Sequence, residues 1–248
     1  MIKYAPAPHL SGRPEKIAVF GFKDSLVGQV LQFLNAEAAY DIVYFFSTTG
    51  LPDLDIEKEH NKRPNRKTEF PIGGKIFGKS IFTTPDYVGK LRSDGIGKVL
   101  LLEENLLLRR EIFSSLKIAG IESITYIHPS VFIGEQVTIG EGTIIFPKCY
   151  IGYKSDIGDG TIIQSNCAVE HHNKIGDFCD INPNLTTGGF TRINDLVEIN
   201  ISVDIINKIS VGTGCRIGAG SLVLSSCEPN SLYYGRPAKK IRHHELSK

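Results

Sequence analysis

The chain has 248 residues, and its 28 Lys and Arg residues nearly balance its 27 Asp and Glu residues. This balance gives no electrostatic reason to expect binding to nucleic acid or to a membrane surface. The sequence has no apolar run of about 18 residues and no signal-peptide pattern at its start, so we expect a cytoplasmic protein without a membrane span.

Predicted strands and helices alternate over residues 1–120. Apolar strands are predicted at 16–21, 41–46 and 98–102, helices at 25–37 and 103–118, a polar loop at 50–72, and a last strand at 123–127. Strands that alternate with helices are typical of a small parallel α/β domain, here expected to be Rossmann-like.

Ligands of such sheets bind at the carboxyl ends of the strands. The loop after the first strand, Gly21, Phe22, Lys23, Asp24 and Ser25, lies at that edge and is the expected substrate-binding segment. It is not a GxGxxG motif, and a plain connection is an equal interpretation.

A period of six residues dominates the rest of the chain. Seventeen consecutive hexads begin at Ile127, and their first position is Ile or Val everywhere except at Thr187. The fifth position is Ser, Thr, Cys or Val in 14 hexads, with Asn173, Leu185 and Ile209 as the exceptions. The second position is Gly in eight hexads and Asn in three, residues that would supply the backbone freedom of turns.

This period predicts short strands joined by turns, three hexads to a triangular coil, with the coils stacked as parallel strands. We therefore expect a β-helix over residues 121–231, followed by a C-terminal tail at 232–248. All five cysteines, Cys149, Cys167, Cys179, Cys215 and Cys227, occupy fifth positions. They are expected to be buried in the interior and not to form disulfides or bind metal.

Four segments resemble one known family: KIAVFGF at 16–22, YIHPSV at 126–131, AVEHHNKIGDF at 168–178 and YGRPAKKI at 234–241. With the α/β domain in front, the chain resembles two-domain bacterial sugar acetyltransferases of the hexapeptide-repeat superfamily. Sialic-acid O-acetyltransferases and the UDP-4-amino-sugar N-acetyltransferases of the bacillosamine pathway typify them. The resemblance implies a left-handed β-helix, a homotrimer with intersubunit sites, acetyl-CoA as acyl donor without metal, and a nucleotide-linked amino sugar as acceptor in surface-glycan biosynthesis.

The resemblance also implies site residues. The general base aligns with His171, and Gly189 offers its N–H to the thioester oxygen. Gly188, Ile201, Gly218, Arg236 and Lys239 complete the expected acetyl-CoA site. Glu170 or Asp180 would orient His171, and His172 would be a second base or a phosphate contact. In the family an acidic residue usually stands at the position of His172, a histidine at Asp180 and another at Ser25.

The hexad frame supports two of these residues independently. His171 is a third-position residue and should project from the surface of the β-helix. Gly189 follows one coil later and should lie beside it, which allows close approach of a thioester.

Several alternatives stay open. Acetylation of a sugar hydroxyl is the alternative within the enzyme class, and a non-catalytic sugar-binding or assembly protein is the alternative outside it. Two further classes do not fit the sequence. A metal enzyme such as a γ-type carbonic anhydrase would need three convergent histidines, and His128 and His171 are 43 residues apart, which is not a whole number of coils. A sugar nucleotidyltransferase would need a larger N-terminal domain with a Gly-rich nucleotide loop, and the sequence has neither.

Overall fold

The computed structural model describes residues 14–21, 24–37, 40–47 and 74–246. The chain divides into two compact units. Of the described residues, one unit contains 104–113 and 124–246, and the other contains 14–21, 24–37, 40–47, 74–103 and 114–123. Residues 104–113 thus belong with the β-helix.

The smaller unit is built on a mainly parallel sheet with the strand order β3-β4-β2-β1-β5-β6. Its strands are β1 (Glu15–Phe20), β2 (Tyr40–Phe46), β3 (Lys75–Ile76), β4 (Lys79–Phe82), β5 (Lys98–Leu101) and β6 (Glu122–Ser123), with helices α1 (Asp24–Glu37) and α3 (Tyr87–Ser93). Strand β1 pairs in parallel with both β2 and β5. The expected parallel α/β organisation is therefore present.

Four features of this region differ from the prediction. The antiparallel hairpin β3–β4 and helix α3 were not predicted. The helix expected from residue 103 begins at Leu106, as α4 (Leu106–Ile118). The single strand expected at 123–127 is two strands, β6 and β7 (Tyr126–Ile127), in different sheets. Helix α3 begins at Asp86, whose carboxylate accepts a hydrogen bond from the N–H of Gly89 at 2.9 Å.

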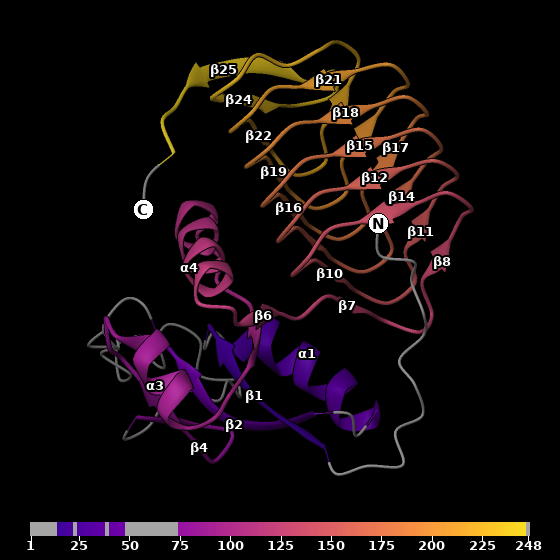
Figure 1. Ribbon diagram of the computed structural model, residues 1–248. Coiled ribbons are helices and arrows are strands. Elements are labelled where there is room, and N and C mark those ends of the chain that lie inside the picture. Colours follow the sequence, from indigo (N-terminus) through magenta and orange to yellow (C-terminus); the bar gives the residue numbers. More distant parts are fainter. Residues whose placement is uncertain (1–13, 22–23, 38–39, 48–73, 247–248) are drawn as a thin grey trace, which may run out of the picture. The chain divides into compact units, whose positions relative to one another are not determined.

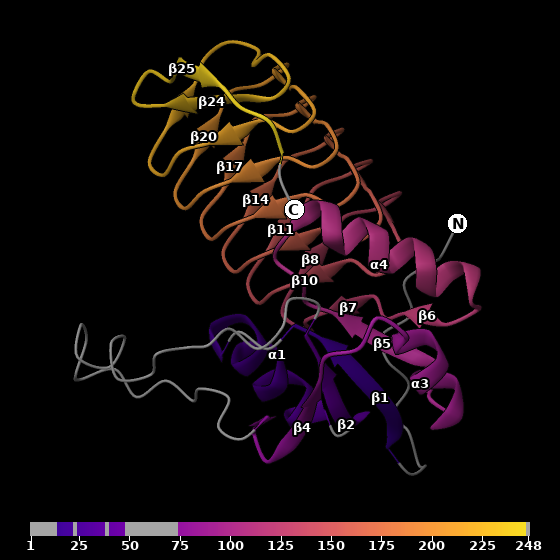
Figure 2. The same cartoon turned by 90° about the vertical axis from the view of Figure 1, so that its left-hand side faces the viewer.

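The larger unit is a prism of stacked triangular coils (Figures 1 and 2). Its first face contains β7, β10 (Ile144–Ile145), β13 (Ile162–Ile163), β16 (Asp180–Ile181), β19 (Glu198–Ile199), β22 (Arg216–Ile217), β24 (Ser231–Tyr234) and β25 (Lys239–His243). The second contains β8 (Phe132–Ile133), β11 (Tyr150–Ile151), β14 (Ala168–Val169), β17 (Thr186–Thr187), β20 (Asp204–Ile205) and β23 (Leu222–Val223). The third contains β9 (Thr138–Ile139), β12 (Asp156–Ile157), β15 (Lys174–Ile175), β18 (Arg192–Ile193) and β21 (Ser210–Val211).

The hexad register is confirmed strand by strand. Ile144 and Ile145 pair in parallel with Ile162 and Ile163, one coil of 18 residues further on. First-position residues fill the interior together with the fifth-position residues, and nearly all of both sets are buried. The segment expected to be a tail instead forms β24 and β25, which extend the first face and cover one end of the prism.

Glycine is needed at the second position for a different reason from the one expected. The left-handed backbone conformation falls on the fourth position, as at Lys154, His172 and Phe190, whose φ angles are 56°, 59° and 61°. A second-position glycine is needed for close stacking instead, because a Cβ on Gly152 would lie 2.7 Å from the backbone nitrogen of His171 in the next coil.

The first turns of α4 pack on the first face. Arg109 is fully buried, and its Nη2 donates a hydrogen bond to the carbonyl of Cys179 at 2.9 Å. The rings of Phe113 and Phe178 meet edge to face, with their centroids 5.3 Å apart. Among the described helices, none is long and apolar enough to cross a membrane.

All five cysteines are buried and free, as predicted. Burial raises the pKa of the Cys179 thiol to about 12. Because all five thiols are buried and a reagent must reach the sulfur atom, we expect the native protein to resist Ellman's reagent and to release five equivalents of thiol only after unfolding in guanidinium. A thiol that reacts rapidly in the native state would contradict this prediction.

Candidate active site

The second and third faces of the prism meet along a corner made of five stacked turns, which we call the histidine corner. The turns are residues 134–137, 152–155, 170–173, 188–191 and 206–209. Each presents its third-position and fourth-position residues at the corner, and residues 18 apart in the sequence lie one above the other. The corner therefore brings three consecutive turns, around residues 153, 171 and 189, into one short stretch of surface.

His171 and His172 project from the middle turn. His171 is exposed, as its third position predicts, and His172 is half-buried. Their Nδ1 atoms lie 3.1 Å apart. In this contact one imidazole donates and the other accepts. If His171 donates through Nδ1, its Nε2 carries a free lone pair and can accept a proton.

Aromatic side chains from the neighbouring turns hold His172 in place. The ring of Phe190 stacks on His172, with centroids 4.6 Å apart and planes inclined by 14°. Tyr153 meets the same imidazole edge to face at 5.6 Å, and Phe190 meets His171 edge to face at 5.4 Å. Neither Phe190 nor Tyr153 was predicted to belong to the site. Their place one coil from the histidines is the signal that would have found them.

Gly189 lies directly beside the imidazole of His171, as predicted from the coil length. A Cβ at this position would lie 2.5 Å from Cε1 and 2.7 Å from Nε2 of His171, closer than real contacts allow. The backbone N–H of Gly189 donates to no acceptor among the described residues. The arrangement thus combines a proton acceptor, a glycine without steric bulk and an uncommitted backbone donor.

Of the two acidic residues expected to orient His171, Glu170 lies near it and Asp180 does not. Glu170 is in the same turn, but its described contacts are made by its backbone: its N–H donates to Oγ1 of Thr187 at 3.1 Å, and its carbonyl accepts from Oγ of Ser155 at 2.9 Å. Asp180 lies in β16 on the first face, away from the histidine corner of its own chain. Within one chain, the partner of the His171 imidazole is His172.

The other residues expected around acetyl-CoA divide into two groups. Gly188 and Gly189 are in the histidine corner, whereas Ile201 and Gly218 lie at the corner between the first and second faces. Nη1 of Arg236 pairs with Asp204 on the second face at 3.0 Å. Lys239 is exposed in β25. The second face therefore separates the histidine corner from Ile201, Gly218 and Arg236.

The predicted substrate loop is described only in part. Gly21 follows β1 at the carboxyl edge of the sheet, with a φ of 103°, and a Cβ there would lie 2.6 Å from the carbonyl oxygen of Leu102. Phe22 and Lys23 lie outside the described residues, as does the whole loop predicted at 50–72. Asp24 and Ser25 form the start of α1.

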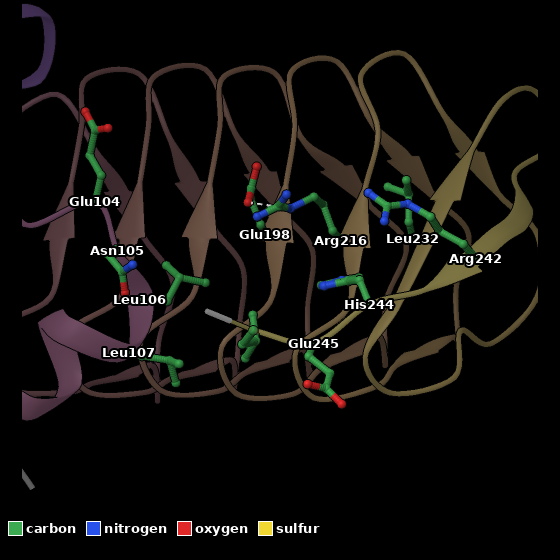
Figure 3. A pocket seen from close by; sticks show the side chains of 11 residues that line it. Glu104, Asn105, Leu106, Leu107, Glu198, Arg216, Leu232, Arg242, His244 and Glu245 are labelled. Atoms are coloured by element: carbon green, nitrogen blue, oxygen red, sulfur yellow. Dashed lines mark ion pairs between the residues drawn. The ribbon is translucent and has the colours of Figure 1, made fainter. Parts of the chain in front are cut away.

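A cavity of about 380 Å³ lies elsewhere in the prism unit, between the start of α4, the first face and the C-terminal segment (Figure 3). Nε of Arg216 pairs with Glu198 at 2.7 Å on its floor. The acidic side chains of Glu104 and Glu245 and the basic side chains of Arg242 and His244 also line the cavity. This mixture of charges favours neither anions nor cations. In the described part of the chain, no three His, Cys, Asp or Glu side chains gather in a way that could hold a metal ion.

Comparison with known proteins identifies the architecture. No family model and no curated protein matches the sequence. Among solved structures, GDP-perosamine N-acetyltransferase from Caulobacter crescentus, in complex with CoA and GDP-perosamine, superposes with a TM-score of 0.76 at 19% identity, over 92% of this chain and 97% of that chain. The chain shares the fold of this acetyltransferase.

Two other structures show the same likeness. The acetyltransferase domain of PglB from Neisseria gonorrhoeae, in complex with acetyl coenzyme A, gives a TM-score of 0.74 at 23% identity, over 92% of this chain and all of that one. WeeI from Acinetobacter baumannii gives 0.53 at 16% identity, with the same coverage of both chains. The expected architecture, an α/β unit joined to a parallel β-helix, is thus found in known acetyltransferases.

Proposed function

We propose that the protein is an acetyl-CoA-dependent N-acetyltransferase that acts on a nucleotide-linked amino sugar, in the synthesis of bacterial surface glycans. The observation that carries the proposal is the placement of His171 beside Gly189 at an exposed corner of the prism. The shared fold supports it, because the Caulobacter enzyme was solved with CoA and GDP-perosamine. The proposal includes the left-handed sense of the coil and a Rossmann-like, sugar-nucleotide-binding character of the N-terminal unit.

The proposed reaction is direct transfer. The sugar amine attacks the thioester carbonyl carbon while Nε2 of His171 removes the amine proton. The oxygen becomes negatively charged in the tetrahedral intermediate, and the backbone N–H of Gly189 donates a hydrogen bond to it. When the intermediate collapses, the carbon–sulfur bond breaks, and the proton on His171 passes to the departing thiolate. The products are the N-acetylated sugar and CoA.

We further propose that three copies assemble and form the sites between them. The second face, which adjoins the histidine corner, carries Phe132 and Tyr150, whose rings stack 5.3 Å apart with 59% and 38% of the residues exposed. Phe190 and Tyr153 add exposed aromatic surface along the corner. Contiguous apolar surface of this kind marks interaction sites. Sedimentation velocity should give the mass of a trimer, and a stable monomer would remove the intersubunit site.

The function is tested by thiol release from acetyl-CoA in the presence of nucleotide-linked amino sugars. We expect release that depends on the acceptor, with mass spectrometry locating one acetyl group on the amine. The same sugars with a hydroxyl in place of the amine are the matched controls. Transfer to the hydroxyl compounds alone would establish the O-acetyltransferase alternative. Sugar binding without thiol release from any acceptor would indicate a non-catalytic protein.

A further inference from the structure

Two side chains inside the prism break the hexad pattern at the same place. Thr187 is the first-position exception to Ile and Val, and Asn173 puts an amide at a fifth position. They are 2% and 1% exposed, and Nδ2 of Asn173 donates a hydrogen bond to Oγ1 of Thr187. Asn173 is the last residue of the turn that carries His171 and His172, and Thr187 precedes the next turn of the histidine corner.

Hydrogen bonds from this pair reach both ends of that turn. At its start, the N–H of Glu170 donates to Oγ1 of Thr187 at 3.1 Å. At its end, Asn173 donates its own N–H to Oγ of Ser155 at 3.2 Å, and its Oδ1 accepts from the N–H of Thr191 at 2.6 Å. The two histidines are the residues between these fixed ends. The network thus ties the turns around residues 153, 171 and 189 to one another.

Stability of the coil does not require this polar pair. In the same columns of the other coils, the first position is Ile or Val, and the fifth position is Val, Ser, Thr, Ile or Cys. Burying an amide and a hydroxyl is costly unless both are hydrogen-bonded, and apolar substitution of both partners is often neutral. The presence of a polar pair in this one coil therefore indicates that the pair serves the turn that carries His171 and His172.

We propose that Asn173 and Thr187 are positioning residues, which hold the His171–His172 turn in the geometry needed for acetyl transfer. The proposal rests on the proposed function. Their contacts fix the backbone on both sides of the two histidines. They thereby keep the imidazole of His172 against Phe190 and in contact with His171. A misplacement of about 1 Å in such a site can lower the rate about a hundredfold.

Two substitutions of Thr187 separate positioning from packing. Thr187→Val keeps the shape and removes the hydroxyl, whereas Thr187→Ser keeps the hydroxyl and removes the methyl group. We expect Thr187→Ser to retain wild-type kcat despite a lower unfolding midpoint, and Thr187→Val to lose about tenfold to a hundredfold in kcat with little change in KM for acetyl-CoA. Activity that follows the unfolding midpoint in both variants would overturn the proposal.

Two further variants complete the design. In the double variant Asn173→Cys/Thr187→Val, which restores the hexad consensus, we expect a near-native unfolding midpoint and the same loss of kcat. Wild-type kcat in this variant would overturn the proposal. Thr161→Val is the matched control, because Thr161 is equally buried. Its Oγ1 donates a hydrogen bond to the carbonyl of Gly176, which lies at the corner between the third and first faces and not at the histidine corner. This control variant should keep wild-type kcat.

A readout without turnover distinguishes failure of this proposal from failure of the proposed function. Nitrogen-15 spectra of the histidine side chains report which ring nitrogen of His171 and His172 carries the proton. We expect the wild type and Thr187→Ser to give the same tautomers, and the double variant to lose the fixed Nδ1–Nδ1 contact. Unchanged spectra in the double variant would overturn the positioning proposal, whether or not the wild type transfers acetyl groups.

Discussion

Replacement of His171 by alanine is expected to lower kcat/KM for acetyl transfer by about 10²–10⁴. In the proposed reaction the exposed imidazole beside Gly189 is the base, so its removal would leave the attacking amine without one. The unfolding midpoint should stay near that of the wild type, because His171 projects outward from the turn and takes no part in the buried core. Thiol release and denaturant unfolding on the same preparations measure the two effects.

His128→Ala is the matched control for this prediction. His128 belongs to the same prism, but its Nδ1 contacts Oγ of Ser130 at 2.9 Å in the first turn, and we expect near-normal turnover. His172→Ala should lose less activity than His171→Ala, because His172 acts through the tautomer of its neighbour. A larger loss in His172→Ala would assign the base to His172.

The prism was predictable because its sequence repeats the same physical requirement 17 times. Each hexad needs an aliphatic residue inside, a small residue at the bend and space for the next coil, so the strands fall where the pattern places them. The expected reason for the second-position glycines, backbone freedom in turns, was wrong. They allow close stacking of two coils, and the pattern of a single hexad does not reveal the distance between coils.

The N-terminal unit was less predictable because its elements are short and lack a repeat. The two-residue strand β3 is too short for a hydrophobic period. Helix α3 has seven residues and a single buried one, Leu91, so its apolar pattern is weak. Its start was still visible in the sequence as Asp86, an N-cap residue that follows a proline.

The candidate site shows the same division. His171 and Gly189 could be paired from sequence because the coil length is constant. The same spacing places Tyr153 and Phe190 beside them, although neither residue type suggests catalysis by itself. Asp180 is close to His171 in sequence but not in space. It follows His171 by nine residues, or one and a half hexads, and therefore lies on another face of the prism. In this prism, residues separated by a whole number of 18-residue coils lie close together, whereas a short separation in sequence does not bring residues together.

Gly189→Ala is the second substitution with a large expected effect. The added Cβ would lie 2.5 Å from Cε1 of His171, so the imidazole must move out of its position between Gly189 and His172. We expect kcat/KM to fall about a hundredfold, as for other displacements of about 1 Å. The backbone N–H is retained in this variant, so the loss reports the placement of the imidazole rather than the oxyanion contact.

Gly188→Ala, at the preceding residue, is the contrasting substitution. A Cβ on Gly188 would meet the backbone nitrogen of Asn207 at 2.3 Å, and the backbone cannot turn aside as an exposed imidazole can. Gly188→Ala should therefore lower the unfolding midpoint, whereas Gly189→Ala should leave it nearly unchanged. If Gly189→Ala kept wild-type kcat/KM, the imidazole of His171 would not need its observed position. The base would then have to be sought outside the contact between His171 and Gly189.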